Sequence, residues 1–191
     1  LYRWKAQFFK NVQEGEPIRL STWVSKMESF MTYREYEMKN EQDEVVARAV
    51  CVCSAMSVES RMLTRIPKSL RASYPLENTS YFSDLPKMKD VTVFEPDFQK
   101  DIEIRYQDID VNAHVNNLVY IDWVWDLLPT SYRREKKISE FDIVYRHEIR
   151  GEKRVTLHAK RIDEKAEELG VKILSEDLKT EYAMIILKFA V

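Results

Sequence analysis

The sequence predicts an α+β protein in which antiparallel sheets wrap a long helix. The 191 residues include only 3 Gly and 6 Pro, so long strands with few tight turns fit better than a sandwich of many short strands. One segment, residues 116–128, has apolar residues at helical spacing, and a run of strands follows it. A short internal repeat further indicates two copies of one structural unit.

The first half of the chain is expected to be a meander of long antiparallel strands. Apolar and polar residues alternate there in stretches rich in aromatic, Val and Thr residues, which is typical of strands. The predicted strands are residues 1–12, 18–25, 30–39 and 44–57, with a turn at 14–17 and a hairpin loop at 40–43.

Residues 58–100 lack this alternation of apolar and polar residues and contain spaced prolines, so they are predicted to be an ordered linker. Short helices are expected in it at residues 67–74 and 83–88. In the second half, strands are predicted on either side of the helix, together with a charged connector that contains Gly170. These strands are residues 101–106, 139–149, 154–162, 171–175 and 180–191.

The repeat aligns residues 8–16 with residues 144–152, an offset of 136 residues. In both segments an apolar pair and a basic residue precede a Gly-Glu turn and a new strand. The same offset places the counterpart of the later strand and helix before residue 1, so we expect these elements of the first copy to precede this chain. It also sets Val12 opposite Glu148, so we expect a complete polar set only in the second copy.

Composition argues against several classes of function. The net charge of −2 gives no general attraction to nucleic acid or anionic lipid, and no apolar run approaches the roughly 20 residues that span a bilayer. Cys51 and Cys53 point to one face of a predicted strand, and no second Cys or His cluster completes a metal site. We therefore expect buried free thiols in a reducing cytoplasm, and no metal or other cofactor.

The polar loop that leads into the predicted helix is the candidate site. If this loop runs extended, Asp110, Asn112 and His114 share one side, because side chains two residues apart in a strand point the same way. A carboxylate, an amide and an imidazole then converge beside a helix N-terminus. Asn116 or Asn117 is the expected N-cap, since a short amide accepts a hydrogen bond from a first-turn N–H group.

The helix itself is expected to be amphipathic. Its predicted apolar face consists of Leu118, Ile121, Trp125 and Leu128, which recur at steps of three and four residues. Pro129 marks its end. Its N-terminal amides and its dipole point at the polar loop and offer a place for a developing oxyanion.

Two motifs are recognisable as those of a known family. The segment Asp110-Val-Asn-Ala-His-Val-Asn-Asn117, followed by Leu-Val-Tyr-Ile-Asp-Trp, resembles the signature of the acyl-ACP thioesterases in their bacterial branch. The segment Tyr145-Arg-His-Glu148 resembles the second signature of that family, in which the glutamate is catalytic. The resemblance implies a tandem (double) hotdog fold, each hotdog being a long helix wrapped by an antiparallel sheet. It also implies a homodimer that hydrolyses acyl-ACP to free fatty acid and carrier protein, which ends fatty-acid synthesis.

On this resemblance, residues 1–66 form a first hotdog whose N-terminal part is absent. Residues 67–100 form a linker, and residues 101–191 form the second hotdog, which carries the catalytic motif.

The chain departs from some relatives at positions that bear on mechanism. Many plant members carry Cys immediately after the glutamate, whereas this chain has Ile149, which excludes a cysteine nucleophile there. Hotdog thioesterases that act on coenzyme A esters more often carry Gly before the histidine and lack the asparagine two residues upstream. This chain has Ala113 and Asn112 at those positions, which favours acyl-ACP as the substrate.

The predicted catalytic residues are Asp110, Asn112, His114 and Glu148. A neutral His114 takes a proton from water, and Glu148, on a neighbouring strand, orients the imidazole or stabilises the imidazolium. Asn112 positions the water or binds the oxyanion, together with the amides of residues 116–118. Asp110 has three roles open to it: holding Asn112, acting as the base, or attacking the thioester. The alternative is a turn that only caps the helix, with Asn116 and Asn117 as caps.

One compact basic run follows the helix and is a candidate docking site for an acidic carrier protein; the alternative is a solvated helix end. It consists of Arg133, Arg134, Lys136 and Lys137. The runner-up functions are an acyl-CoA thioesterase of the same fold and a catalytically silent acyl-binding hotdog protein. A hotdog hydratase fits less well, because the pattern of Asn112 and Glu148 differs from its Asp-to-His spacing.

Overall fold

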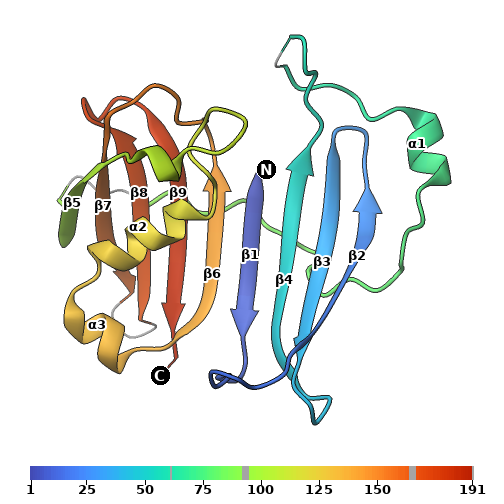
Figure 1. The fold of residues 1–191 in the computed structure, drawn as a ribbon, viewed down its shortest axis with the longest axis horizontal. Coiled ribbons are helices and arrows are strands. Elements are labelled where there is room, and N and C mark those ends of the chain that lie inside the picture. The colour runs from blue at the N-terminus through green and yellow to red at the C-terminus, as the bar shows by residue number, and fades with distance from the viewer. Residues whose placement is uncertain (61, 92–94, 164–166, 191) are drawn as a thin grey trace. The chain divides into compact units, whose positions relative to one another are not determined.

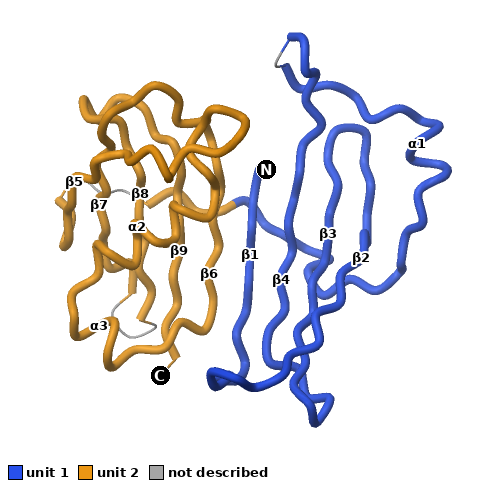
Figure 2. The backbone as a smooth tube through the Cα atoms, in the orientation of Figure 1, with its two compact units in different colours: residues 1–87 blue, residues 88–191 orange. Residues whose placement is uncertain are grey.

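The computed structural model describes residues 1–60, 62–91, 95–163 and 167–190. The chain forms two compact units, residues 1–87 and residues 88–191 (Figure 2). The predicted division at residues 66 and 100 stays a prediction. Parts of the predicted linker and connector, and the last residue of the final predicted strand, lie outside the described residues; these are residues 61, 92–94, 164–166 and 191.

In unit 1 the described residues form an antiparallel sheet with strand order β2-β3-β4-β1 (Figure 1). The strands are β1 (Arg3–Phe8), β2 (Arg19–Met27), β3 (Met31–Lys39) and β4 (Val45–Ser54). The four strands predicted for the first half are therefore confirmed. The predicted meander is wrong for β1, which pairs with β4 and not with β2. The reason is that residues 9–18 form a connection too long for a tight hairpin.

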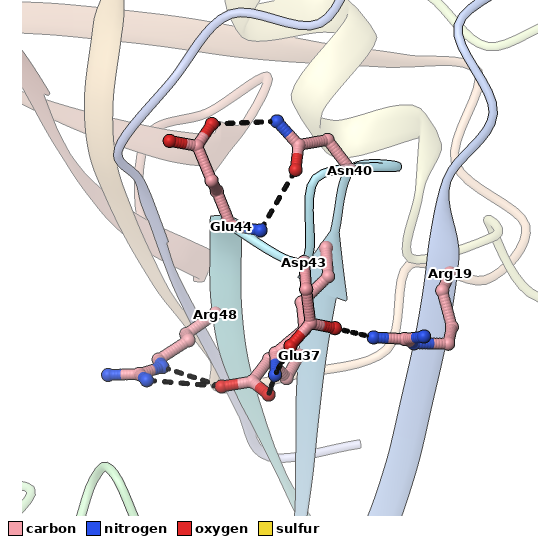
Figure 3. A network of polar contacts seen from close by, with 7 residues as sticks. Arg19, Glu37, Asn40, Asp43, Glu44 and Arg48 are labelled. Atoms are coloured by element: carbon pink, nitrogen blue, oxygen red, sulfur yellow. Dashed lines mark hydrogen bonds and ion pairs between the residues drawn. The ribbon is translucent and has the colours of Figure 1, made fainter.

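Asn40 closes the hairpin between β3 and β4 (Figure 3). Its side-chain oxygen accepts a hydrogen bond from the Glu44 amide at 2.9 Å, and its Nδ2 donates to the Glu44 carboxylate at 3.0 Å. Asp43 has a positive φ of 62°, a conformation that Asp tolerates better than bulkier residues, and it also pairs with Arg19 of β2. The hairpin loop predicted at residues 40–43 is confirmed.

The linker region contains α1 (Lys68–Ser73), which confirms the helix predicted at residues 67–74. The helix predicted at residues 83–88 is wrong, because this segment is irregular. Contacts to the sheet account for the difference: the Arg3 guanidinium donates to the Pro86 carbonyl at 2.8 Å, which ties the segment across β1.

In unit 2 the described strands pair antiparallel in the order β6-β9-β8-β7-β5, and helix α2 lies across them (Figure 1). The strands are β5 (Phe98–Glu103), β6 (Ile138–Tyr145), β7 (Arg154–Asp163), β8 (Glu168–Ser175) and β9 (Glu181–Phe189). The helices are η1 (Tyr106–Asp108), α2 (Val119–Leu127) and α3 (Thr130–Glu135). Between sheet and helix lies a core of residues with no more than 1% exposure, including Ile143, Leu157, Val171 and Ile185. Every strand and the long helix predicted for this half are present.

The internal repeat extends to the topology. The order β7-β8-β9-β6 in unit 2 reproduces the order β2-β3-β4-β1 in unit 1. The two glycines that the repeat aligns, Gly15 and Gly151, both have positive φ, 85° and 71°, where a side chain would be strained. The described residues of unit 1 contain no counterpart of α2 or β5. That such elements precede residue 1 stays a prediction.

Helix α2 has the predicted period but not the predicted buried face. Its buried side chains are Tyr120, Trp123, Val124 and Leu127, whereas Leu118 is 66% exposed. Of the predicted face, Leu128, which directly follows the helix, is buried. Both sets of residues recur at steps of three and four, so spacing alone cannot choose between them. The structure buries the face with the larger aromatic surface, whose Tyr120 ring packs on Tyr145 at a centroid distance of 5.3 Å.

Gly170 lies in β8 and not in a connector, because β8 begins at Glu168. A Cβ atom at Gly170 would lie 2.7 Å from both γ carbons of Val91. The absence of a side chain thus lets the segment around Val91 cross the sheet at this point, where Asp90 also pairs with Lys172 at 2.9 Å. Within the described residues, no helix has the length and apolarity to cross a bilayer.

Candidate active site

The loop between η1 and α2 is a closed turn. Ile109 and Val115 form an isolated antiparallel bridge, and between them the Asp110 amide donates to the His114 carbonyl at 2.9 Å. Ala113 has a positive φ of 58°. The predicted extended loop is therefore wrong, yet its polar side chains do converge, because the two ends of a tight turn lie side by side.

Asp110 holds Asn112 and faces His114. Its Oδ1 accepts the Asn112 amide at 2.8 Å, its Oδ2 accepts the Asn112 side-chain amide at 3.3 Å, and His114 Nδ1 lies 3.7 Å from Oδ2. Burial alone would raise the pKa of Asp110, but the hydrogen bonds from Asn112 and the neighbouring His114 outweigh it and lower that pKa. Asp110 is therefore ionised at neutral pH, so both of its oxygens can accept hydrogen bonds.

The stability contributed by the Asp110 carboxylate is expected to depend on pH. Because folding lowers its pKa below the ordinary 3.8, this contribution is full above that value and is lost as pH falls through the lowered value. The difference in urea midpoint between the wild type and Asp110→Asn should be constant from about pH 5 to pH 8 and shrink in stronger acid. A difference that grows as pH falls would contradict this.

His114 presents Nε2 as its basic nitrogen. Its Nδ1 lies 3.1 Å from the Val115 carbonyl, which can only accept a hydrogen bond, so this contact selects the Nδ1–H tautomer. The Nε2 lone pair is then free to take a proton. Glu148 Oε1 lies 3.9 Å from Nε2, beyond a direct hydrogen bond.

Glu148 lies beyond the end of β6 and not on a neighbouring strand as predicted, because β6 ends at Tyr145. The next residue, Ile149, is 1% exposed, and its carbonyl accepts the Val115 amide at 3.1 Å. This bond joins the second motif to the turn that holds His114. Sequence reasoning missed this anchor, because a backbone bond between distant segments leaves no local signal.

Arg150 is a second residue that the sequence reasoning missed. Its Nε donates to Glu148 Oε2 at 2.7 Å. The available signal was spacing, since residues two apart in an extended segment point to the same side.

Asn116 and Asn117 organise the start of α2. The Asn116 side-chain oxygen accepts the Leu118 amide at 3.0 Å. The N-cap of α2 is Leu118, which has no side-chain capping bond, so the predicted N-cap at Asn116 or Asn117 is wrong. The Asn116 amide itself donates to the Asp108 carbonyl at 2.8 Å. Of the three amides expected to bind an oxyanion, only that of Asn117 makes no hydrogen bond within the part of the chain that the structure describes.

Asp108 holds the start of the loop in place, and the sequence reasoning did not identify it. Its carboxylate is 1% exposed and accepts the Arg105 amide at 2.8 Å and the Arg105 guanidinium at 2.9 Å. The Asp108 carbonyl in turn accepts the Asn116 amide. The spacing of three between Arg105 and Asp108 was the signal, because this is the spacing of a capping pair at a helix start.

The basic run predicted to dock a carrier protein lies on and after α3, at the opposite end of α2 from the catalytic loop (Figure 1). Arg133, Arg134 and Lys137 are exposed. Lys136 is engaged within the unit, because its Nζ pairs with Glu167 at 2.7 Å. Three of the four predicted side chains are thus presented to solvent.

The two cysteines lie on β4 in unit 1. Their sulfur atoms are 3.4 Å apart on one face, with Cys51 buried and Cys53 half-buried. The hydrogen bond from Cys51 lowers the pKa of the Cys53 thiol to about 6. Their placement on one face as free thiols is as predicted, whereas burial holds for Cys51 alone of the two. The reducing compartment stays a prediction.

Two family models together match most of the chain. The model of the acyl-ACP thioesterase C-terminal domain matches residues 92–189, and that of the N-terminal domain matches residues 1–74. The chain is 26% identical over 144 residues to a chloroplastic dodecanoyl-acyl-carrier-protein hydrolase of Cinnamomum camphora, which is 70% of this chain and 37% of that protein. It is 25% identical over 159 residues to oleoyl-acyl carrier protein thioesterase 2 of Arabidopsis thaliana, 76% of this chain and 42% of that protein. The chain thus spans about two fifths of the length of these relatives.

The fold matches solved structures over nearly the whole chain. A crystal structure of an acyl-ACP thioesterase from Bacteroides thetaiotaomicron superimposes with a TM-score of 0.86 at 18% identity. The match covers 99% of this chain and 75% of that chain. The architecture is therefore the predicted double hotdog.

Proposed function

Because the chain belongs to the acyl-ACP thioesterase family, we propose that it hydrolyses acyl-ACP to free fatty acid and carrier protein. The observation that carries the proposal is the facing pair His114 Nε2 and Glu148 Oε1, 3.9 Å apart, beside a turn held by Asp110. A base with a free lone pair and an adjacent carboxylate is what activation of water requires.

In the proposed mechanism, His114 Nε2 takes a proton from a water molecule as the water oxygen attacks the thioester carbonyl. The new bond places negative charge on the carbonyl oxygen, which the Asn117 amide, just before α2, stabilises. Glu148 stabilises the imidazolium. Collapse of the tetrahedral intermediate breaks the carbon–sulfur bond, and His114 returns its proton to the leaving thiolate.

Asp110 has the role of orienting Asn112 in this proposal. Both of its oxygens accept hydrogen bonds from Asn112, the closer at 2.8 Å. A carboxylate engaged twice is poorly placed to attack a carbonyl or to accept another proton. Asn112 then positions the attacking water.

The test is release of free thiol by the purified protein, measured side by side with acyl-ACP and acyl-CoA at matched acyl chains. We expect turnover of acyl-ACP at the higher kcat/KM, with large losses in His114→Ala and Glu148→Ala. Cleavage of acyl-CoA at least as fast as acyl-ACP would instead make the protein an acyl-CoA thioesterase. Binding of acyl groups without thiol release would make it a non-catalytic acyl-binding protein. Full activity in both variants would show that the proposed site is not the catalytic site.

The carrier protein is proposed to dock through the exposed cations Arg133, Arg134 and Lys137. Carrier proteins are acidic, so charge favours this contact, which salt should weaken. A homodimer in the cytoplasm is proposed on the resemblance to the family alone.

A further inference from the structure

Arg150 and Glu148 flank a fixed point in the backbone. Ile149, between them, is 1% exposed, and its carbonyl accepts the Val115 amide at 3.1 Å. Val115 directly follows His114, so this bond fixes the backbone of the base relative to the backbone of the ion pair. The remaining freedom lies in the Glu148 side chain, which is 51% exposed.

The arginine removes much of that freedom. Its Nε donates to Glu148 Oε2 at 2.7 Å, while the other carboxylate oxygen, Oε1, faces His114 Nε2 at 3.9 Å. The guanidinium is planar and always charged, so it fixes the direction of a carboxylate as well as its charge.

We propose that Arg150 is a positioning residue, which binds one oxygen of Glu148 and thereby holds the other oxygen facing His114. This inference rests on the proposed function. The gap between Glu148 and His114 leaves the Nε2 lone pair open to water before proton transfer. Once the imidazolium forms, the carboxylate is already oriented to pair with it. The entropy cost of fixing the Glu148 side chain in one rotamer is therefore not added to the activation free energy.

The test is a double-mutant cycle on the rate of thiol release with acyl-ACP. We expect Arg150→Ala to lower kcat about tenfold and to leave KM within about twofold, because a misplaced group weakens the transition state more than substrate binding. Arg150→Lys should recover part of the loss, since it restores the charge without the planar fork. In a Glu148→Gln background, Arg150→Ala should cause no further loss, because Arg150 acts through Glu148.

A matched control is Arg154→Ala. Arg154 is also partly exposed and pairs with a glutamate, Glu103, at 3.2 Å, but outside the site. Its removal should leave kcat within about twofold, which separates the loss of a positioned cation from the loss of an ordinary surface ion pair.

The outcomes separate this inference from the proposed function. If the wild-type protein releases no thiol, both the proposed function and the role of Arg150 are wrong. If the wild type is active and Arg150→Ala keeps full activity, only the inference falls. If Arg150→Ala raises KM and its effect multiplies with that of Glu148→Gln, Arg150 binds the substrate directly and the positioning role is wrong.

Discussion

Replacing His114 with alanine is expected to lower kcat for thioester hydrolysis by a factor of about 10²–10⁴, the range that a general base contributes. The Nδ1 contact to the Val115 carbonyl, at 3.1 Å, leaves Nε2 as the free base of the site. KM should stay within about twofold, because in the proposed mechanism the imidazole interacts with the attacking water and not with the bound acyl chain. Steady-state thiol release with acyl-ACP measures both constants.

The matched control is His147→Ala. His147 is exposed, lies next to Glu148, and has its backbone amide bonded to the Tyr182 carbonyl. Removing its imidazole should leave kcat within about twofold of the wild type. A His114→Ala variant that retains most of its activity would contradict the assignment, and the search for the base would move to Asp110.

Replacing Asp108 with alanine is expected to lower the free energy of unfolding by about 2–3 kcal/mol, from the loss of a cap and of charged hydrogen bonds. The buried Asp108 carboxylate accepts both the amide and the guanidinium of Arg105. Its removal leaves the Arg105 amide without a partner at the start of the catalytic loop. Urea unfolding followed by circular dichroism measures the change, and thiol release should fall with it.

Glu103→Ala is the matched control for Asp108→Ala. Glu103 also pairs with an arginine, Arg154, at 3.2 Å, but its side chain is 81% exposed. Exposed pairs contribute little, so its removal should cost less than about 1 kcal/mol. Equal losses in the two variants would show that burial of Asp108 does not matter.

Most strands could be predicted from the sequence, because alternation of apolar and polar residues reports directly which face of a sheet is buried. Which strands pair with each other was harder to predict from the sequence. Residues 1–12 were correctly predicted as a strand, yet β1 pairs with β4, since the length of a connection and not the strand's own sequence decides its neighbour. The prediction of which face of α2 is buried was wrong for a related reason. Two sets of apolar residues on the helix have the same spacing, and packing against Tyr145 determines which set is buried.

The residues of the candidate site that could be identified from the sequence lie in two recognisable motifs, of which the second contains Glu148. Asp110, Asn112 and His114 were identified together, although the turn that joins them depends on the positive φ of Ala113, which no pattern indicated. Asp108 and Arg150 were missed because both act by supporting other groups, and such support depends on distances. Arg150 is only two residues from Glu148, but the 2.7 Å contact between Nε and Oε2 depends on how both side chains are oriented in the folded chain.

The burial of Ile149 has a consequence for chemical probes of this enzyme family. A thiol placed there by Ile149→Cys would occupy a core position that is 1% exposed. A reagent that alkylated it would need room that the packing does not provide, and would separate the Ile149 carbonyl from the Val115 amide. Loss of activity after treatment of such a variant with a thiol reagent would therefore indicate that the two backbone segments had been pushed apart. It would not be evidence that a catalytic nucleophile had been modified.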